Sequence, residues 1–128
     1  MNGSPVDIFQ KNVGSLIARN RNVLDILTKC QVTCGKICRS TIKSATGCGC
    51  LKITGEKASL DFSENAFEKN ETSIEGKLCH ECRGIIENEI GESLFYIASL
   101  CNALGISMED VMKREIEKVE VLGKYSLY

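Results

Sequence analysis

The 128-residue sequence has no tryptophan, one proline, one histidine and an aromatic content of only 5%. A single proline excludes collagen-like and proline-rich chains. One histidine leaves little material for histidine-based acid–base catalysis. The sequence also lacks an excess of charge of one sign, since it has 16 basic and 17 acidic residues. This balance argues against nucleic acid or an anionic membrane surface as a partner. The composition is that of an ordinary globular protein.

Long apolar runs are absent as well. The longest apolar segment, Leu94 to Cys101, falls far short of the roughly 18 residues that a membrane span requires. Residues 1–20 lack the apolar centre of a secretion signal, because Asp7, Gln10 and Lys11 interrupt it. We therefore expect no membrane segment and a reducing, cytoplasmic location, in which the eight cysteines are thiols or metal ligands rather than disulfides.

Apolar residues recur every three or four positions in four segments, which predicts an all-α, four-helix bundle forming one domain over residues 1–128. The polar residues 51–77 predict a long loop between the second and third helices, with a short helix near 64–69. No segment shows the alternation of a strand. The predicted helices are 6–20, 22–45, 79–104 and 108–122, with Ser107 capping the last and Gly47, Gly105 and Gly123 ending the later three.

Two close cysteine pairs, Cys48 with Cys50 and Cys79 with Cys82, flank this polar segment. Four thiolates satisfy a tetrahedral Zn²⁺ ion, and Gly49 permits the turn that points the first two sulfurs inward. We predict a structural zinc site that anchors both ends of the loop. An iron–sulfur cluster suits the same four thiolates. Four unliganded thiols, or a disulfide with a redox role, would also account for the two pairs.

The remaining cysteines and the histidine fit simpler roles. Cys30, Cys34 and Cys38 recur every fourth residue on the second predicted helix, and Cys101 lies on the third. Cysteine behaves as a small apolar residue, so core packing is the favoured interpretation, with a soft metal as the alternative. His80, inside the second cysteine pair, is expected to point away from the ion.

Carboxylates and lysines mark two further surfaces. Glu89 and Glu92 lie three residues apart on the third predicted helix and share one face, on which Mg²⁺ could bridge them. A solvated acidic face is the simpler explanation. The second predicted helix carries Lys36, Arg39 and Lys43, which form either a phosphate-binding stripe or a solvated face.

The segment from Ile86 through Glu89, Glu92 and Leu104-Gly-Ile resembles the second metal-binding helix of the MazG-like nucleoside triphosphate pyrophosphohydrolases. The motifs Ser-Ala-Thr-Gly-Cys-Gly-Cys50, Leu-Cys-His-Glu-Cys-Arg83 and the ending Leu-Gly-Lys-Tyr-Ser-Leu127 are similar to those of small Gram-positive members. The resemblance implies a dimer or tetramer, Mg²⁺ held by acids of two helices, and hydrolysis of a nucleotide to its monophosphate and pyrophosphate.

The sequence departs from that family in the second helix, where active members carry Glu-x-x-Glu. Residues 29–39 contain no acid, and Asp25 is the helix's only carboxylate. We expect a pyrophosphohydrolase-related protein that binds Mg²⁺ through Glu89 and Glu92, helped by Glu81 or Asp25, with degenerate catalysis. The alternative is a non-catalytic nucleotide sensor or protein-interaction module, while a regulator that binds nucleic acid lacks interleaved aromatic residues.

Overall fold

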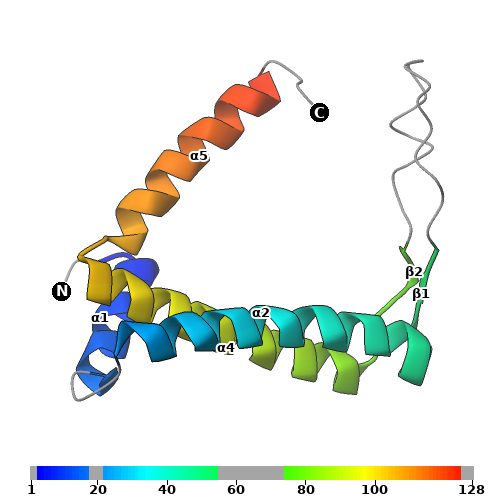
Figure 1. Cartoon of the computed structure of the whole chain (residues 1–128). Helices are drawn as coiled ribbons and strands as arrows, with labels where there is room; N and C mark the ends of the chain where they lie inside the picture. Colours follow the sequence, from blue (N-terminus) through cyan, green and yellow to red (C-terminus); the bar gives the residue numbers. More distant parts are fainter. Residues whose placement is uncertain (1–2, 18–21, 55–73, 125–128) are drawn as a thin grey trace. The chain divides into compact units, whose positions relative to one another are not determined.

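The computed structural model describes residues 3–17, 22–54 and 74–124. Most of these residues are helical, which confirms the predicted class (Figure 1). The four α-helices of the described ranges are α1 (Pro5–Ile17), α2 (Val23–Lys43), α4 (His80–Leu104) and α5 (Met108–Lys124). None of them is by itself both long enough and apolar enough to cross a bilayer.

The predicted loop over 51–77 is wrong at both ends, where short strands form. Strand β1 (Leu51–Ile53) pairs antiparallel with β2 (Ile74–Gly76), so that Leu51 lies opposite Gly76. Each strand has only three residues, too few for a period of two to be recognised in the sequence. The short helix predicted near 64–69 lies outside the described residues.

Glycine positions decide where two of the helices end. Gly105 follows α4 with φ of 68°, the left-handed conformation predicted for a C-terminal cap. Gly47 does not end the second helix, because α2 continues into a π-helical turn, η1 (Ser44–Cys48), that ends at Gly49 with φ of 84°. Gly123 does not stop the last helix either, since α5 continues through it to Lys124.

The chain divides into two compact units. One contains residues 1–32 and 91–128, with Val13, Ile26 and Ala98 buried in its described part. The other contains residues 33–90, in which Leu51 and Ile86 are buried. One domain over residues 1–128 stays a prediction.

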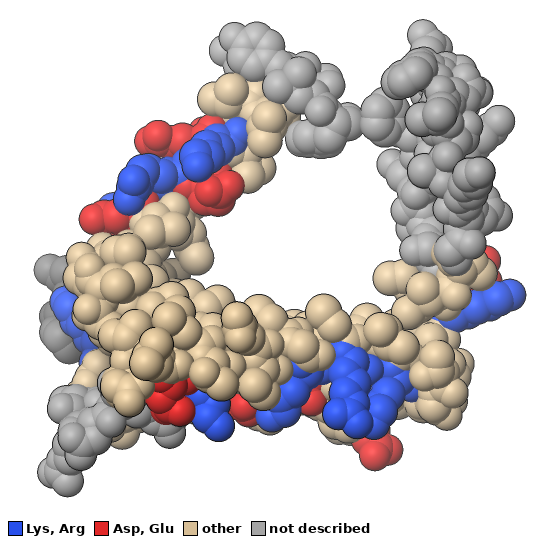
Figure 2. Space-filling model, in the orientation of Figure 1, with Lys and Arg blue, Asp and Glu red and all other residues tan. Residues whose placement is uncertain are grey.

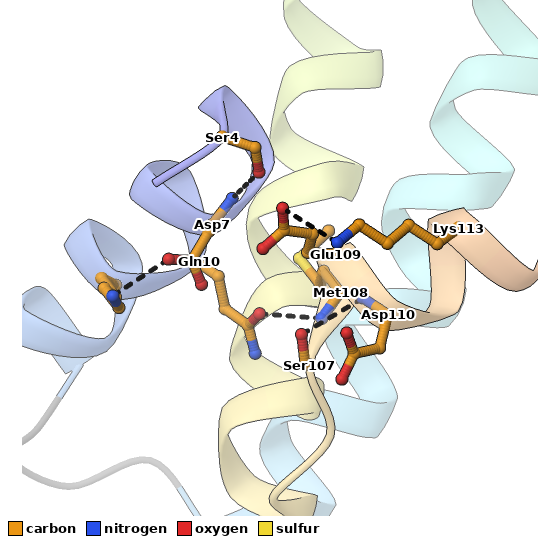
Figure 3. Close-up of polar contacts among 9 residues, drawn as sticks. Ser4, Asp7, Gln10, Ser107, Met108, Glu109, Asp110 and Lys113 are labelled. Atoms are coloured by element: carbon orange, nitrogen blue, oxygen red, sulfur yellow. Dashed lines mark hydrogen bonds and ion pairs between the residues drawn. The ribbon is translucent and has the colours of Figure 1, made fainter. Parts of the chain in front are cut away.

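Gln10 of α1 hydrogen-bonds to the backbone just before and at the start of α5, within the first unit, and Figure 3 shows its bond to Met108. The side chain is buried, its Nε2 donates to the Ile106 carbonyl at 2.7 Å, and its Oε1 accepts from the Met108 N–H at 2.8 Å. The Asn102 Nδ2 donates to the Gln10 carbonyl at 3.0 Å. The Ser107 Oγ then accepts from the Asp110 N–H at 3.2 Å, which confirms the predicted N-cap of α5.

Several predicted core positions are exposed. Cys34 and Cys38 are exposed, so core packing is wrong for both, whereas Cys30 and Cys101 are half-buried. The buried positions of α2 and the turn after it are instead Ile26, Thr33 and Ser44, because the buried face is rotated from the predicted one by about one residue, or roughly 100°. Leu16, Leu27, Leu94, Ile97 and Leu104, whose helical spacing predicts burial, are also exposed.

Candidate metal centre

The four predicted cysteines come together within the unit of residues 33–90. Cys48 is the last residue of η1, and Cys50 directly precedes β1. Cys79 directly precedes α4, and Cys82 lies in its first turn. The cluster therefore joins the C-terminal end of one helix to the N-terminal end of another.

The π-helical turn sets the position of the first pair. The Gly49 N–H donates to the Ser44 carbonyl at 2.9 Å, five residues back, so the turn holds one residue more than an α-helical turn. Gly49 then reverses the chain through its positive φ. The same Ser44 carbonyl accepts from the Cys50 Sγ at 3.6 Å. Cys48 and Cys50 are thereby held on one side of a tight backbone turn.

The strand pair fixes the chain immediately after Cys50. Gly76 has φ of 91°, and a Cβ at this position would lie 2.6 Å from the Cys50 carbonyl oxygen. No side chain fits between these backbones, so the approach requires glycine. The pairing brings the chain back beside the first cysteine pair three residues before Cys79 enters the cluster.

The distances between the sulfur atoms match a single ion. All four Sγ atoms lie within 4.8 Å of one another, and those of Cys48 and Cys79 are 3.8 Å apart. Four sulfurs at about 2.3 Å from a tetrahedral ion lie about 3.8 Å from each other. The predicted cluster is confirmed as a group that could hold a metal ion. Within the described ranges it is the one such group of three or more histidine, cysteine or acidic residues.

Hydrogen bonds distribute charge unequally among the thiols. The Cys82 N–H donates to the Cys79 Sγ at 3.4 Å and lowers the pKa of Cys79 to about 7. Interaction with Cys79 in turn raises the pKa of Cys82. The pKa of Cys48 is also raised, because bonds from the Cys50 N–H and the Cys82 thiol, which lower it, are outweighed by contacts with the Cys79 and Cys50 thiols and by burial. The Cys79 thiol therefore loses its proton more readily than the thiols of Cys48 and Cys82.

His80 is exposed at the start of α4 and does not belong to the cluster. The expectation that its side chain points away from a bound ion stays a prediction.

The candidate catalytic carboxylates occupy different environments. Glu89 is half-buried, and its carboxylate accepts a hydrogen bond from the Ser40 hydroxyl of α2. Glu92 is half-buried one turn further along α4, and Glu81 is exposed in the first turn of that helix. The structure does not bring these three acids together as a metal-binding group. Their catalytic role stays a prediction.

The basic residues proposed for phosphate binding lie on the surface of α2. Lys36, Arg39 and Lys43 are all exposed and lie in the C-terminal half of α2, the helix that leads to the cysteine cluster. An exposed position is compatible with both interpretations, a ligand-binding stripe and a solvated face.

Sequence reasoning missed three residues that shape the site. Ser40 and Ser44 were overlooked because isolated serines carry no recognisable pattern, although the first bonds to Glu89 and the second to Cys50. Gly76 gave a usable signal: it follows Ile-Glu and precedes the second cysteine pair, where a turn or close backbone approach is common.

Comparison with protein-family models, curated proteins and solved structures finds no match for this chain.

Proposed function

We propose that this protein is a zinc-stabilised, MazG-like helical protein whose metal site is structural and whose hydrolase activity is degenerate or absent. The observation that carries the proposal is the group of four sulfur atoms within 4.8 Å. Four thiolates complete a tetrahedral shell and leave no position open for water or substrate, which is typical of structural zinc. The expected function is that of a nucleotide sensor or protein-interaction module in a reducing cytoplasm.

Sulfur spacing favours one ion over an iron–sulfur cluster. A cluster binds its cysteines through different iron atoms, so their sulfurs are spread further apart than around one ion. The 3.8 Å between the sulfurs of Cys48 and Cys79 is the edge of a single tetrahedron. The hydrogen bond from the Cys82 N–H to the Cys79 sulfur adds an outer-shell interaction of the kind that orients metal ligands.

Metal analysis tests the site directly. We expect about one zinc per chain in protein purified under reducing conditions, and its loss in Cys79→Ser and Cys82→Ser. Cys34→Ser and Cys38→Ser are matched controls, since both thiols are exposed on α2 and lie outside the cluster. Substitution with Co²⁺ should give the absorption of a tetrahedral thiolate site. A chain that takes up neither metal contradicts the proposal. Bound iron with the absorption spectrum of an iron–sulfur cluster would show that the site holds a cluster and not zinc.

The half-buried Glu89, held toward α2 by Ser40, favours a second candidate, a working pyrophosphohydrolase. Its hydrogen-bonded carboxylate could bind Mg²⁺ together with Glu92, with nucleotide phosphates on Lys36, Arg39 and Lys43. The stretch of α2 near Ser40 supplies no acid to complete such a site. We therefore expect weak Mg²⁺ binding and little turnover.

Pyrophosphate release from a panel of nucleoside triphosphates, with Mg²⁺ or Mn²⁺, distinguishes the two candidates. Brisk release that Glu89→Gln and Glu92→Gln abolish establishes the enzyme. No release, with nucleotide binding that is lost in a Lys36→Ala, Arg39→Ala, Lys43→Ala triple variant, supports a sensor. If the unmodified chain neither releases pyrophosphate nor binds nucleotides, the result supports a metal-stabilised interaction module.

Self-association is part of the proposal. Many large apolar side chains of the described helices are exposed, including those at Leu24, Ile85, Leu94, Ile116 and Val119. Exposed apolar surface of this extent marks an interaction site, and dimers and tetramers of identical chains are the commonest assemblies.

A further inference from the structure

The cysteine cluster has one thiol that is exposed to solvent. Cys48, at the end of η1, is exposed, whereas Cys50, Cys79 and Cys82 are half-buried. A small reactant in solution therefore meets the Cys48 sulfur first. Zinc binds cysteine as the thiolate, which is the nucleophilic form of the side chain. The proposed ion would thus hold a reactive sulfur at the protein surface.

Basic residues lie close in sequence to all four cysteines. Residues 43–54 and 74–83 carry four basic and two acidic side chains, so positive charge is in excess. The basic residues are exposed, and Figure 2 shows blue side chains beside the strands. They are Lys43, Lys52, Lys77 and Arg83. Four thiolates around a divalent ion carry an excess of negative charge, so these surroundings suit an ion held by four thiolates.

Cys48 and Cys79 are placed to form a disulfide. Their sulfur atoms are 3.8 Å apart, and a bond of about 2.0 Å requires them to approach by about 1.8 Å more, which is within the reach of side-chain rotation. The Cys50 sulfur is instead turned to the Ser44 carbonyl, to which it donates at 3.6 Å. The Cys82 N–H, at 3.4 Å, holds the Cys79 sulfur in its position beside Cys48.

We propose that the cluster reacts with hydrogen peroxide, which joins Cys48 to Cys79 and releases the ion. The Cys48 thiolate attacks one peroxide oxygen, the O–O bond breaks, and hydroxide leaves with the electron pair. The Cys79 thiolate then attacks the sulfur of the resulting sulfenic acid, and the remaining oxygen leaves as hydroxide. The two thiolates are oxidised, the peroxide is reduced, and the ion dissociates because half of its ligands are lost. The inference rests on the proposed zinc site and adds a reactivity to it.

The pairing determines what happens to the fold when the ion leaves. A bond between Cys48 and Cys79 spans residues 49–78, whose ends the ion also holds together. The bond therefore keeps this segment closed, whereas a disulfide within either cysteine pair would let it open. We expect the oxidised, zinc-free chain to melt at least about 5 °C above the reduced, zinc-free chain. In a reducing compartment such a bond is transient, as in redox-sensing proteins.

Peroxide treatment of the zinc-loaded full chain tests the reaction. A colorimetric chelator measures the zinc released, and trypsin digestion without reduction shows the pairing. Because trypsin cleaves after lysine and arginine, it leaves the first cysteine pair in peptide 44–52 and the second in peptide 78–83. We expect about one zinc released per chain, with the two peptides linked by a disulfide that fragmentation assigns to Cys48 and Cys79. Dithiothreitol and added zinc should restore the bound ion.

The matched control is the double variant Cys34→Ser, Cys38→Ser, which removes two exposed thiols outside the cluster and should release zinc as the wild type does. A chain purified without zinc overturns the proposed site and this inference together. A zinc-loaded chain that keeps its ion in peroxide overturns the inference alone. Zinc release with the two peptides unlinked, or with a disulfide within each pair, also overturns it and leaves the proposed zinc site standing.

Discussion

The cysteine cluster and the hydrogen bonds of Gln10 to Ile106 and Met108, here called the Gln10 junction, each connect segments that are far apart in the sequence. They use different chemistry. At the cluster, Cys48 and Cys50 meet Cys79 and Cys82 across an intervening segment of 28 residues. At the junction, Gln10 bonds to backbone atoms 96 and 98 residues away. If the proposed metal site is correct, the first connection depends on a bound ion, whereas the second is made by the polypeptide itself. Metal removal and substitutions at the cysteine cluster should therefore affect one region, and substitution of Gln10 should affect the other.

Metal removal should have the largest effect, confined at first to residues 33–90. Linking the ends of a segment of about 30 residues stabilises a fold by several kcal/mol, since the unfolded chain loses that freedom. We expect excess chelator, or Cys79→Ser, to lower the melting temperature by about 10 °C or more. Calorimetry with and without added zinc measures this. Cys38→Ser is the control, and an equal loss there would mean that the cluster has no special role.

Gly76→Ala should be the next most damaging change. The added Cβ would meet the Cys50 carbonyl at 2.6 Å, at a φ that alanine adopts with strain. We expect a loss of about 3 kcal/mol of unfolding free energy, together with weaker metal binding. Gly47→Ala is the matched control, because a Cβ there meets open space. Urea unfolding and a zinc competition titration measure the two effects, and equal results for both variants contradict the close approach.

Gln10→Leu tests the other region. The substitution keeps the size of the side chain but leaves the Met108 N–H and the Ile106 carbonyl without their partner, which costs about 2 kcal/mol. Hydrogen exchange of the Met108 amide should accelerate, while zinc affinity stays unchanged. Gln31→Leu, at an exposed position of α2, should leave that amide protected. Altered metal binding in the Gln10 variant would show that the two regions are coupled.

Ser40→Ala should have the smallest effect. It removes the hydrogen bond to Glu89 of α4, worth about 1 kcal/mol where a carboxylate accepts from a hydroxyl. Ser15→Ala removes a hydroxyl that bonds only within α1 and should cost less. Urea unfolding compares the two variants, and a Ser15 variant as unstable as the Ser40 variant would contradict a specific link between α2 and α4.

The two regions also differ in how far sequence could predict them. Closely spaced cysteine pairs are a recognisable metal-binding pattern, so the four candidate ligands could be predicted from their spacing alone. Gln10 is a polar residue on an amphipathic helix, and nothing in its neighbours indicates partners 96 and 98 residues away. The burial of Thr33 in place of Cys34 was missed because a hydrophobic pattern does not count small polar side chains, although these can be buried.

The π-helical turn between Ser44 and Cys48 makes the cysteine cluster sensitive to chain length as well as to residue type. Each residue of a helix advances the side-chain direction by about 100°. Deleting Thr46 would restore an ordinary α-helical turn, yet it would swing the Cys48 sulfur roughly a quarter of a circle away from Cys79. A single-residue deletion here should therefore leave the helix content unchanged but abolish metal binding. The extra residue of the π-helical turn thus sets the direction from which Cys48 would reach the proposed metal ion.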